Sequence, residues 1–267
     1  MKKSIILLTL FLSISWNHCA FAQLAMGKYR ERVDITPGQT VRGTINLSNR
    51  SNKLIFLRAY LKDIKFVQPF DGKKEVLAAG STPYSISKWI KVSPDSFNIP
   101  ANGKQTVTYT INVPKGARGS YYGTIYFEKI AAGNVESATS VSLAMSWGYT
   151  LFLETKDKIK KAAIDGVSFG NGAIQGNIAN TGDVLLVSTP TFYIMDEKGM
   201  VYDKGTLQDL YLPAGEKAVF KAAISPKIPQ GKHTLFLSFD FGGTAPQLKE
   251  INFSKTESGA IQILATK

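Results

Sequence analysis

The feature that most constrains this sequence is a period-two alternation of apolar and polar residues that recurs along the chain. Residues 41–48, 106–113 and 235–241 show it clearly. Such alternation is typical of antiparallel strands that bury one face and expose the other. Pairs of the type Asn-Gly, Asp-Gly and Pro-Gly separate the alternating stretches, as turns between strands do. Because no segment carries an apolar stripe at helical spacing over three turns, the sequence predicts an all-β fold.

The same plan of strands and turns occurs twice. Asn49 follows an alternating stretch in the first half, and Asn180 follows one in the second half. Each is followed by a proline turn, at Pro100 and Pro213, and later by a Pro-x-Gly corner. Many short strands at this spacing are typical of β-sandwiches. We therefore predict two immunoglobulin-like β-sandwich domains in tandem, residues 23–155 and 156–267.

The first copy carries extra residues. Asn49 and Pro100 lie 51 positions apart, whereas Asn180 and Pro213 lie 33 positions apart. The additional stretch falls near residues 66–87, for which the sequence predicts a loop or an added hairpin. We place the boundary between the copies in the polar run 156–161. This run is predicted to be a solvated linker, and the alternative is a docking patch.

The first 22 residues have the features of a signal peptide. Two lysines open the segment, an apolar run follows at residues 5–12, and Ala20-Phe21-Ala22 forms a small-x-small cleavage site. The predicted mature protein starts at Gln23 and is periplasmic or secreted. Since Cys19 is the single cysteine and lies in this segment, we expect no disulfide, no metal site and no cofactor. No other stretch is long and apolar enough to span a membrane.

The positive charge is concentrated in the first predicted domain. Residues 23–155 contain 17 Lys plus Arg and 9 Asp plus Glu, whereas residues 156–267 contain 13 and 11. All six arginines of the mature chain fall in the first domain: Arg30, Arg32, Arg42, Arg50, Arg58 and Arg118. Arginine forms paired hydrogen bonds with carboxylates and phosphates that lysine does not reproduce. The first domain is thus predicted to face an anionic partner, with ordinary surface arginines as the alternative.

Several motifs of the first copy resemble a known family. They are Pro37-Gly38, the stretch 45–49, the stretch 89–94, and the prolines at 100 and 114. Together they resemble the N-terminal immunoglobulin-like domain of bacterial pilus-assembly chaperones, and the second copy resembles the companion domain of that family. The first copy also resembles the first domain of WxL-interacting cell-surface proteins. Those proteins carry a C-terminal membrane span that residues 261–267 do not provide, which favours the periplasmic family.

The resemblance implies a binding site in the first domain. Pilus chaperones hold a subunit's terminal carboxylate with an arginine near the first strand, and Arg30 or Arg32 matches it. The family's lysine on the last strand of the domain corresponds here to Thr150. That strand keeps an alternating apolar row, which implies binding of a protein client, such as a fimbrial subunit, by strand addition; its members are Val141, Leu143, Met145, Trp147 and Tyr149. The alternative is that the row forms one layer of the domain core.

Catalytic constellations are scarce in the mature chain. His233 is its single histidine, and a surface or partly buried position is predicted for it. Phosphate-binding loops, dinucleotide fingerprints and paired-histidine metal motifs are absent from the sequence. We therefore predict a protein that is not an enzyme, with a glycosidase-type carboxylate pair as the open alternative. The competing function is a module that binds an anionic envelope polymer such as a glycan or lipopolysaccharide, and nucleic acid is not an expected partner.

Overall fold

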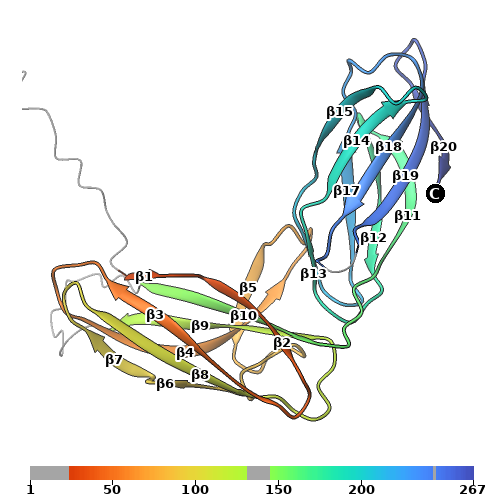
Figure 1. Ribbon diagram of the computed structural model, residues 1–267. Coiled ribbons are helices and arrows are strands. Elements are labelled where there is room, and N and C mark those ends of the chain that lie inside the picture. Colours follow the sequence, from red (N-terminus) through yellow and green to blue (C-terminus); the bar gives the residue numbers. More distant parts are fainter. Residues whose placement is uncertain (1–23, 131–144, 243–244) are drawn as a thin grey trace, which may run out of the picture.

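The computed structural model describes residues 24–130, 145–242 and 245–267. All regular structure in these residues is β, arranged as two elongated sandwiches that meet at an angle (Figure 1). The predicted all-β fold with two sandwich domains is confirmed. Residues 1–23 lie outside the described part, so the signal peptide stays a prediction. The structure contains, in the ranges it describes, no helix of sufficient length and apolarity to cross a bilayer.

Domain 1 consists of two facing sheets. The first sheet has the order β1-β3-β8-β6. The second has the order β2-β10-β9-β4-β5, with β7 paired to β4. Among the strand pairs that the structure describes in this domain, only that of β2 with β10 is parallel. The strands span β1 Leu24–Met26, β2 Arg30–Ile35, β3 Thr40–Asn49, β4 Ile55–Phe66, β5 Lys74–Ala78, β6 Ile90–Ser93, β7 Ser96–Ile99, β8 Lys104–Asn112, β9 Ser120–Ile130 and β10 Ser146–Thr155.

Domain 2 is a second sandwich built from smaller sheets. Its strand orders are β11-β12-β17, β13-β16 and β15-β14-β18-β19-β20. The strands span β11 Ala162–Gly170, β12 Ala173–Asn180, β13 Leu186–Ser188, β14 Thr191–Asp196, β15 Val201–Thr206, β16 Leu210–Leu212, β17 Lys217–Ala223, β18 Gly231–Phe239, β19 Gln247–Lys255 and β20 Ile261–Thr266. Six residues, 156–161, thus separate the end of β10 from the start of β11. We propose that the domain boundary lies between residues 155 and 156.

The alternation in the sequence matches the burial of the strands. In β8 the side chains of Val107, Tyr109 and Ile111 are buried, and their neighbours along the strand face outward. In β17 buried and exposed side chains alternate over all seven residues. Since a strand turns successive side chains to opposite faces, this pattern packs one face of each sheet into the sandwich. The alternating stretch 235–241 extends beyond its strand, because β18 ends at Phe239.

The extra stretch of the first copy contains an added hairpin. Strands β4 and β5 pair in antiparallel register, with Lys62 opposite Ala78 and Phe66 opposite Lys74. Figure 1 shows this hairpin in the corner between the two domains. The return segment is held by buried Asp63, whose carboxylate accepts hydrogen bonds from Thr82 and Ser85. The hairpin alternative of the sequence analysis is therefore confirmed for this region.

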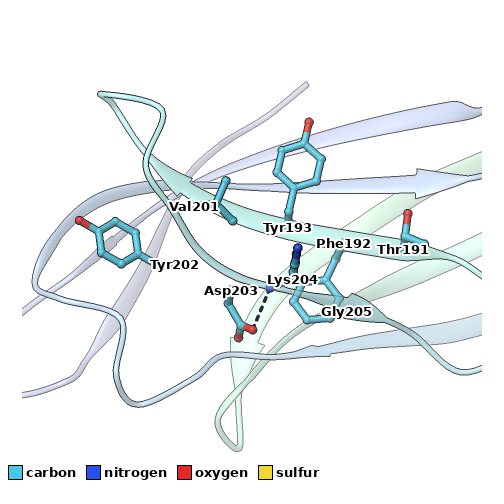
Figure 2. Close-up of a pocket in the computed structure, with 8 residues that line it drawn as sticks. All are labelled: Thr191, Phe192, Tyr193, Val201, Tyr202, Asp203, Lys204 and Gly205. Carbon is cyan, nitrogen blue, oxygen red and sulfur yellow. Dashed lines mark hydrogen bonds between the residues drawn. The ribbon is translucent and has the colours of Figure 1, made fainter.

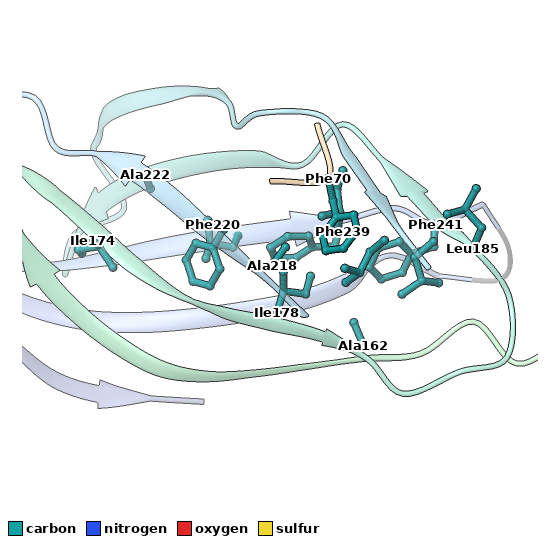
Figure 3. Close-up of a cluster of buried hydrophobic side chains, with 14 of the residues drawn as sticks. Phe70, Ala162, Ile174, Ile178, Leu185, Ala218, Phe220, Ala222, Phe239 and Phe241 are labelled. Carbon is teal, nitrogen blue, oxygen red and sulfur yellow. The ribbon is translucent and has the colours of Figure 1, made fainter. Parts of the chain in front are cut away.

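The hairpin brings domain 1 into the core of domain 2. Ile64, Phe66 and Phe70 belong to the same buried apolar cluster as Phe220 and Phe239. Figure 3 shows Phe70 beside the domain 2 side chains. Backbone contacts reinforce the junction, because Tyr211 donates its N–H to the carbonyl of Phe70 at 2.7 Å. Apolar contacts and this hydrogen bond therefore join the hairpin of domain 1 to domain 2.

Candidate functional site

A cavity of about 400 Å³ lies in the corner between the domains. Strands β2, β9 and β10 form its floor, the β4–β5 hairpin forms one side, and Tyr211 of β16 reaches it from domain 2. Its lining residues are Tyr29, Arg30, Phe66, Gly72, Lys74, Thr124, Tyr126, Gly148, Thr150, Phe152 and Tyr211. The set contains two cationic side chains and no carboxylate. It is therefore suited to an anionic group among aromatic rings.

The two arginines that the sequence left as alternatives have different surroundings. They lie two residues apart in β2 and share its outer face. Arg30 lines the cavity, and its guanidinium lies 3.4 Å from the hydroxyl of Tyr211. Arg32 instead places its Nε 3.3 Å from the carboxylate of buried Glu154. The geometry thus leaves Arg30 open to a ligand and commits Arg32 to an ion pair.

Position 150 is polar but not cationic. Thr150 is buried in β10, and its hydroxyl lies 3.0 Å from that of Thr124 on the neighbouring strand. The second cation of the cavity is Lys74, from the first residue of β5. Its partial desolvation there lowers the pKa of the ammonium group. Sequence reasoning did not single out Lys74, because only the pairing of the hairpin brings residue 74 close to residue 30.

Strand β10 has a free edge next to this cavity. Its parallel pairing with β2 begins at Thr150, so residues 146–149 have a strand partner only on the β9 side. Thr150 donates its N–H to the carbonyl of Tyr29 on the β2 side. Backbone groups of a strand alternate in direction, so those of Gly148 and Ser146 point to that same side. No strand of the described residues occupies it.

Gly148 of β10 packs closely against the side chains of β9. A Cβ at position 148 would lie 2.9 Å from the methyl group of Thr124 and 3.3 Å from the ring of Tyr126. A larger residue would have to displace those side chains. Glycine at position 148 therefore leaves room for the side chains of Thr124 and Tyr126.

The apolar row of β10 is divided between core and surface. Tyr149 is buried in the core of domain 1, and its hydroxyl donates a hydrogen bond to Glu31. Trp147 is half-buried against the same core, and Met145 is exposed. Tyr149 therefore does not offer its ring to a partner in the folded domain. Val141 and Leu143 lie outside the described residues.

The run 156–161 is more than a solvated linker. Lys158 and Lys160 place their ammonium groups 3.1 and 3.5 Å from the Oε2 atom of Glu154. Lys160 also donates hydrogen bonds of 2.9 Å to the carbonyls of Phe241 and Gly242 in domain 2. Burial lowers the pKa of Lys160 despite the nearby carboxylate. These contacts tie the start of domain 2 to the end of β10.

The remaining candidates are His233 and a groove in domain 2. His233 was expected at the surface or partly buried, and that expectation is wrong: the residue is 3% exposed, and its Nε2 lies 2.9 Å from the carbonyl of Pro229. The groove along β14 and β15, of about 920 Å³, contains Phe192 packed against Gly205 and a single carboxylate, Asp203, which binds a backbone N–H (Figure 2). In the described ranges no three metal-binding side chains gather.

Comparison with known proteins adds information on the fold. No family model and no curated protein sequence matches the chain. Among solved structures, the class 5 fimbriae chaperone CfaA aligns over 91% of this chain and 99% of its own, with a TM-score of 0.53 and 14% identity. A chain from a chaperone–tip adhesin complex of CFA/I fimbriae biogenesis aligns over 92% and 100%, with a TM-score of 0.52 and 13% identity. The protein thus has the two-domain fold of fimbrial chaperones.

Proposed function

We propose that this protein is a non-enzymatic periplasmic assembly chaperone that binds a protein client, such as a pilus subunit, by β-strand addition through domain 1. The observation that carries the proposal is the free edge of β10 at residues 146–149, which leads directly into the cavity lined by Arg30. An exposed edge offers a row of unpaired backbone groups to an extended segment. A client strand would extend the sheet beyond the end of β2.

The side chains near this edge support such a contact. Met145 is exposed and Trp147 is half-buried, so both can pack against an apolar client surface. In the sequence, the alternating apolar residues that we propose for the contact also include Val141 and Leu143. Tyr149 contributes indirectly, because its burial in the core fixes the path of β10. Arg30 is the proposed anchor for an anionic group of the client.

The similarity in fold supports the same proposal. One of the matching structures is named as a fimbriae chaperone, and another is a chain from a complex with a tip adhesin. An anionic envelope polymer as the partner stays an untested prediction.

Backbone pairing can be tested with one proline. Ser146→Pro removes an N–H from the free edge, and Ser146→Ala keeps it. We expect the proline variant to lose at least about tenfold in affinity for a purified pilus subunit, since it can no longer donate to the added strand and its ring crowds the approach. The measurement is complex formation by size-exclusion chromatography together with suppression of subunit aggregation followed by light scattering.

The alanine variant is the matched control and should bind like the unmodified protein. Circular dichroism of both variants establishes that domain 1 is folded. If a folded Ser146→Pro protein captured the subunit as well as Ser146→Ala, strand addition at this edge would be refuted. If neither variant nor the unmodified protein bound any pilus subunit, the choice of client class would be wrong.

A further inference from the structure

We infer that the outer face of the β1-β3-β8-β6 sheet binds an acidic polysaccharide, through Arg42, Lys91 and Lys104 and the hydroxyl and amide side chains between them. We call this surface the polar face. Thr124 of β9 lines the cavity, whereas the next residue, Ile125, is buried in the domain 1 core. The cavity and the polar face therefore belong to different sheets, on opposite sides of the sandwich. The inference does not rest on the proposed function.

The first argument is the composition of the polar face. Its four strands contain no Asp or Glu, and Ala25 is the one apolar residue that they turn outward along their described lengths. Interfaces between proteins have an apolar and aromatic centre, which is missing here. Hydroxyl and amide groups donate and accept hydrogen bonds, as the hydroxyls of sugars require. The outward side chains that carry such groups are Thr40, Thr44, Asn46, Ser48, Ser93, Thr106, Thr108, Thr110 and Asn112.

The second argument is the placement of the charges. Arg42 of β3 and Lys91 of β6 both lie opposite Thr110 of β8, so the two cations lie in one row across the sheet, about 10 Å apart at their Cα atoms. Lys104 begins β8, at about 20 Å from Thr110 along the strand. None of these three cations takes part in an ion pair among the residues that the structure describes. Uncompensated charge at both ends of β8 suits an extended polymer with repeated anions.

The third argument is that the centre of the polar face offers free hydroxyl groups. Thr106 donates its hydroxyl to Asn46 at 2.9 Å, and a second Thr–Asn pair lies at the other end of the two strands, at 3.0 Å. Thr44 and Thr108 lie opposite each other between these pairs, and both are exposed. Their hydroxyls have no partner among the described residues. Because a threonine side chain in a strand is restricted in its rotamers, these groups lose little entropy when a ligand binds.

The equivalent sheet of domain 2 differs from the polar face. Strands β12 and β17 correspond to β3 and β8, since the corner asparagines end β3 and β12. On that sheet Val219 is an exposed apolar residue, and the carboxylate of Asp165 accepts a hydrogen bond from Asn177 on the outer face. The absence of carboxylates and of large apolar side chains is therefore specific to the domain 1 sheet.

The test uses the two-domain protein, residues 23–267, and needs no pilus subunit. The probe is fluorescently labelled polygalacturonate, a carboxylated polysaccharide, and its binding is followed by anisotropy. We expect saturable binding that weakens at least about tenfold between about 0.05 and 0.5 M salt, because the contacts are exposed charges. Unlabelled polygalacturonate should displace the probe, and neutral dextran should not. Vesicles of phosphatidylglycerol, at the same concentration of anionic groups, should displace it less well than polygalacturonate does.

The variant is Arg42→Gln combined with Lys91→Gln. Its matched control is Lys217→Gln combined with Lys221→Gln, which removes the same charge from exposed positions of β17. We expect the first variant to weaken polygalacturonate binding about tenfold and the control less than about twofold. Circular dichroism establishes that both are folded.

Three results would overturn the inference. Equal losses in the two variants would show that net charge alone binds the polymer. Unchanged binding by the folded Arg42→Gln, Lys91→Gln protein would exclude the polar face as the site. Better displacement by the vesicles, or equal displacement by dextran, would show that an acidic polysaccharide is not the preferred partner. Each of these results leaves strand addition at β10 untouched.

Discussion

Asn49 of domain 1 and Asn180 of domain 2 occupy equivalent corners, and the surfaces around those corners differ. Both side chains are buried. The amide of Asn49 donates to the carbonyls of Lys53, Ile99 and Pro100, at 2.8 to 3.1 Å. The amide of Asn180 donates to the carbonyls of Val184 and Leu212, at 2.7 and 2.9 Å. In each domain the asparagine side chain thus binds both the turn that follows it and the segment next to the proline turn.

The difference between the domains lies in what was added around this shared frame. Domain 1 has the extra hairpin, the free edge of β10, and the cations Arg30 and Lys74, which form no ion pair with the residues that the structure describes. Domain 2 contributes Tyr211 to the cavity and apolar side chains to the junction. A repeated fold can therefore carry binding in one copy and support in the other.

The largest effect is expected from removing the corner amides. Asn49→Ala removes three hydrogen bonds, one of them buried, so we expect the free energy of unfolding to fall by about 3 kcal/mol. Asn180→Ala removes two buried hydrogen bonds and should cost about 2 kcal/mol. Both tryptophans downstream of residue 22, Trp89 and Trp147, lie in domain 1, so their fluorescence reports that domain. Denaturant unfolding followed by fluorescence and by circular dichroism distinguishes the two domains.

The control for the corner is Asn46→Ala, in the same strand as Asn49. Asn46 is exposed, and its side chain accepts one hydrogen bond from Thr106. The change should alter stability by less than about 0.5 kcal/mol. If the two corner variants were no less stable than this control, the corners would not be the frame that the domains share.

These corners were visible in the sequence because their signals are local. Asn49 and Asn180 each follow an alternating stretch, and the alternating stretch 106–113 coincides with β8, Lys104–Asn112. Period two records which side chains are buried, and turn residues record where strands end. The fold class was therefore predictable without knowledge of which strands pair.

The cavity was only half predictable, because it depends on pairings between distant segments. Sequence reasoning proposed Arg30 and Arg32 together, and only the position of Glu154 separates them. Lys74 was invisible as a site residue, since the register of the hairpin sets its position. The burial of His233 also depends on tertiary packing, in which Phe253 and Tyr202 lie against its ring. Period-two patterns carry no information on such contacts.

The second prediction compares the loss of a buried charge cluster with the loss of an exposed ion pair. The free energy of unfolding should respond more to the first. Glu154 is 2% exposed and faces Arg32, Lys158 and Lys160. We expect Glu154→Gln to lower the free energy of unfolding by about 2 kcal/mol, because partly buried cations lose their counter-charge. Thermal unfolding should show domain 1 and the junction weakening together.

The matched change in domain 2 is Glu197→Gln. Glu197 and Lys232 lie 3.7 Å apart and are both more than half exposed. Water screens this pair, so its loss should cost less than about 0.5 kcal/mol. Equal effects of the two substitutions would show that the cluster around Glu154 does not hold the junction.

The smallest expected effect is the dependence of stability on acidic pH, and we expect it in domain 1. Partial burial alone would raise the pKa of Glu31, but hydrogen bonds from Lys28, Tyr149 and Tyr109 outweigh it and lower the pKa below the ordinary 4.5. A carboxylate whose pKa is lower in the folded state stabilises that state above its unfolded pKa. This contribution is present above about pH 4.5 and is lost as the pH falls through the lower folded value. The fluorescence midpoint should therefore drop below that pH, and Glu31→Gln should flatten the drop. An unchanged pH dependence in Glu31→Gln would show that the hydrogen bonds from Tyr109 and Tyr149 do not couple domain 1 stability to acid.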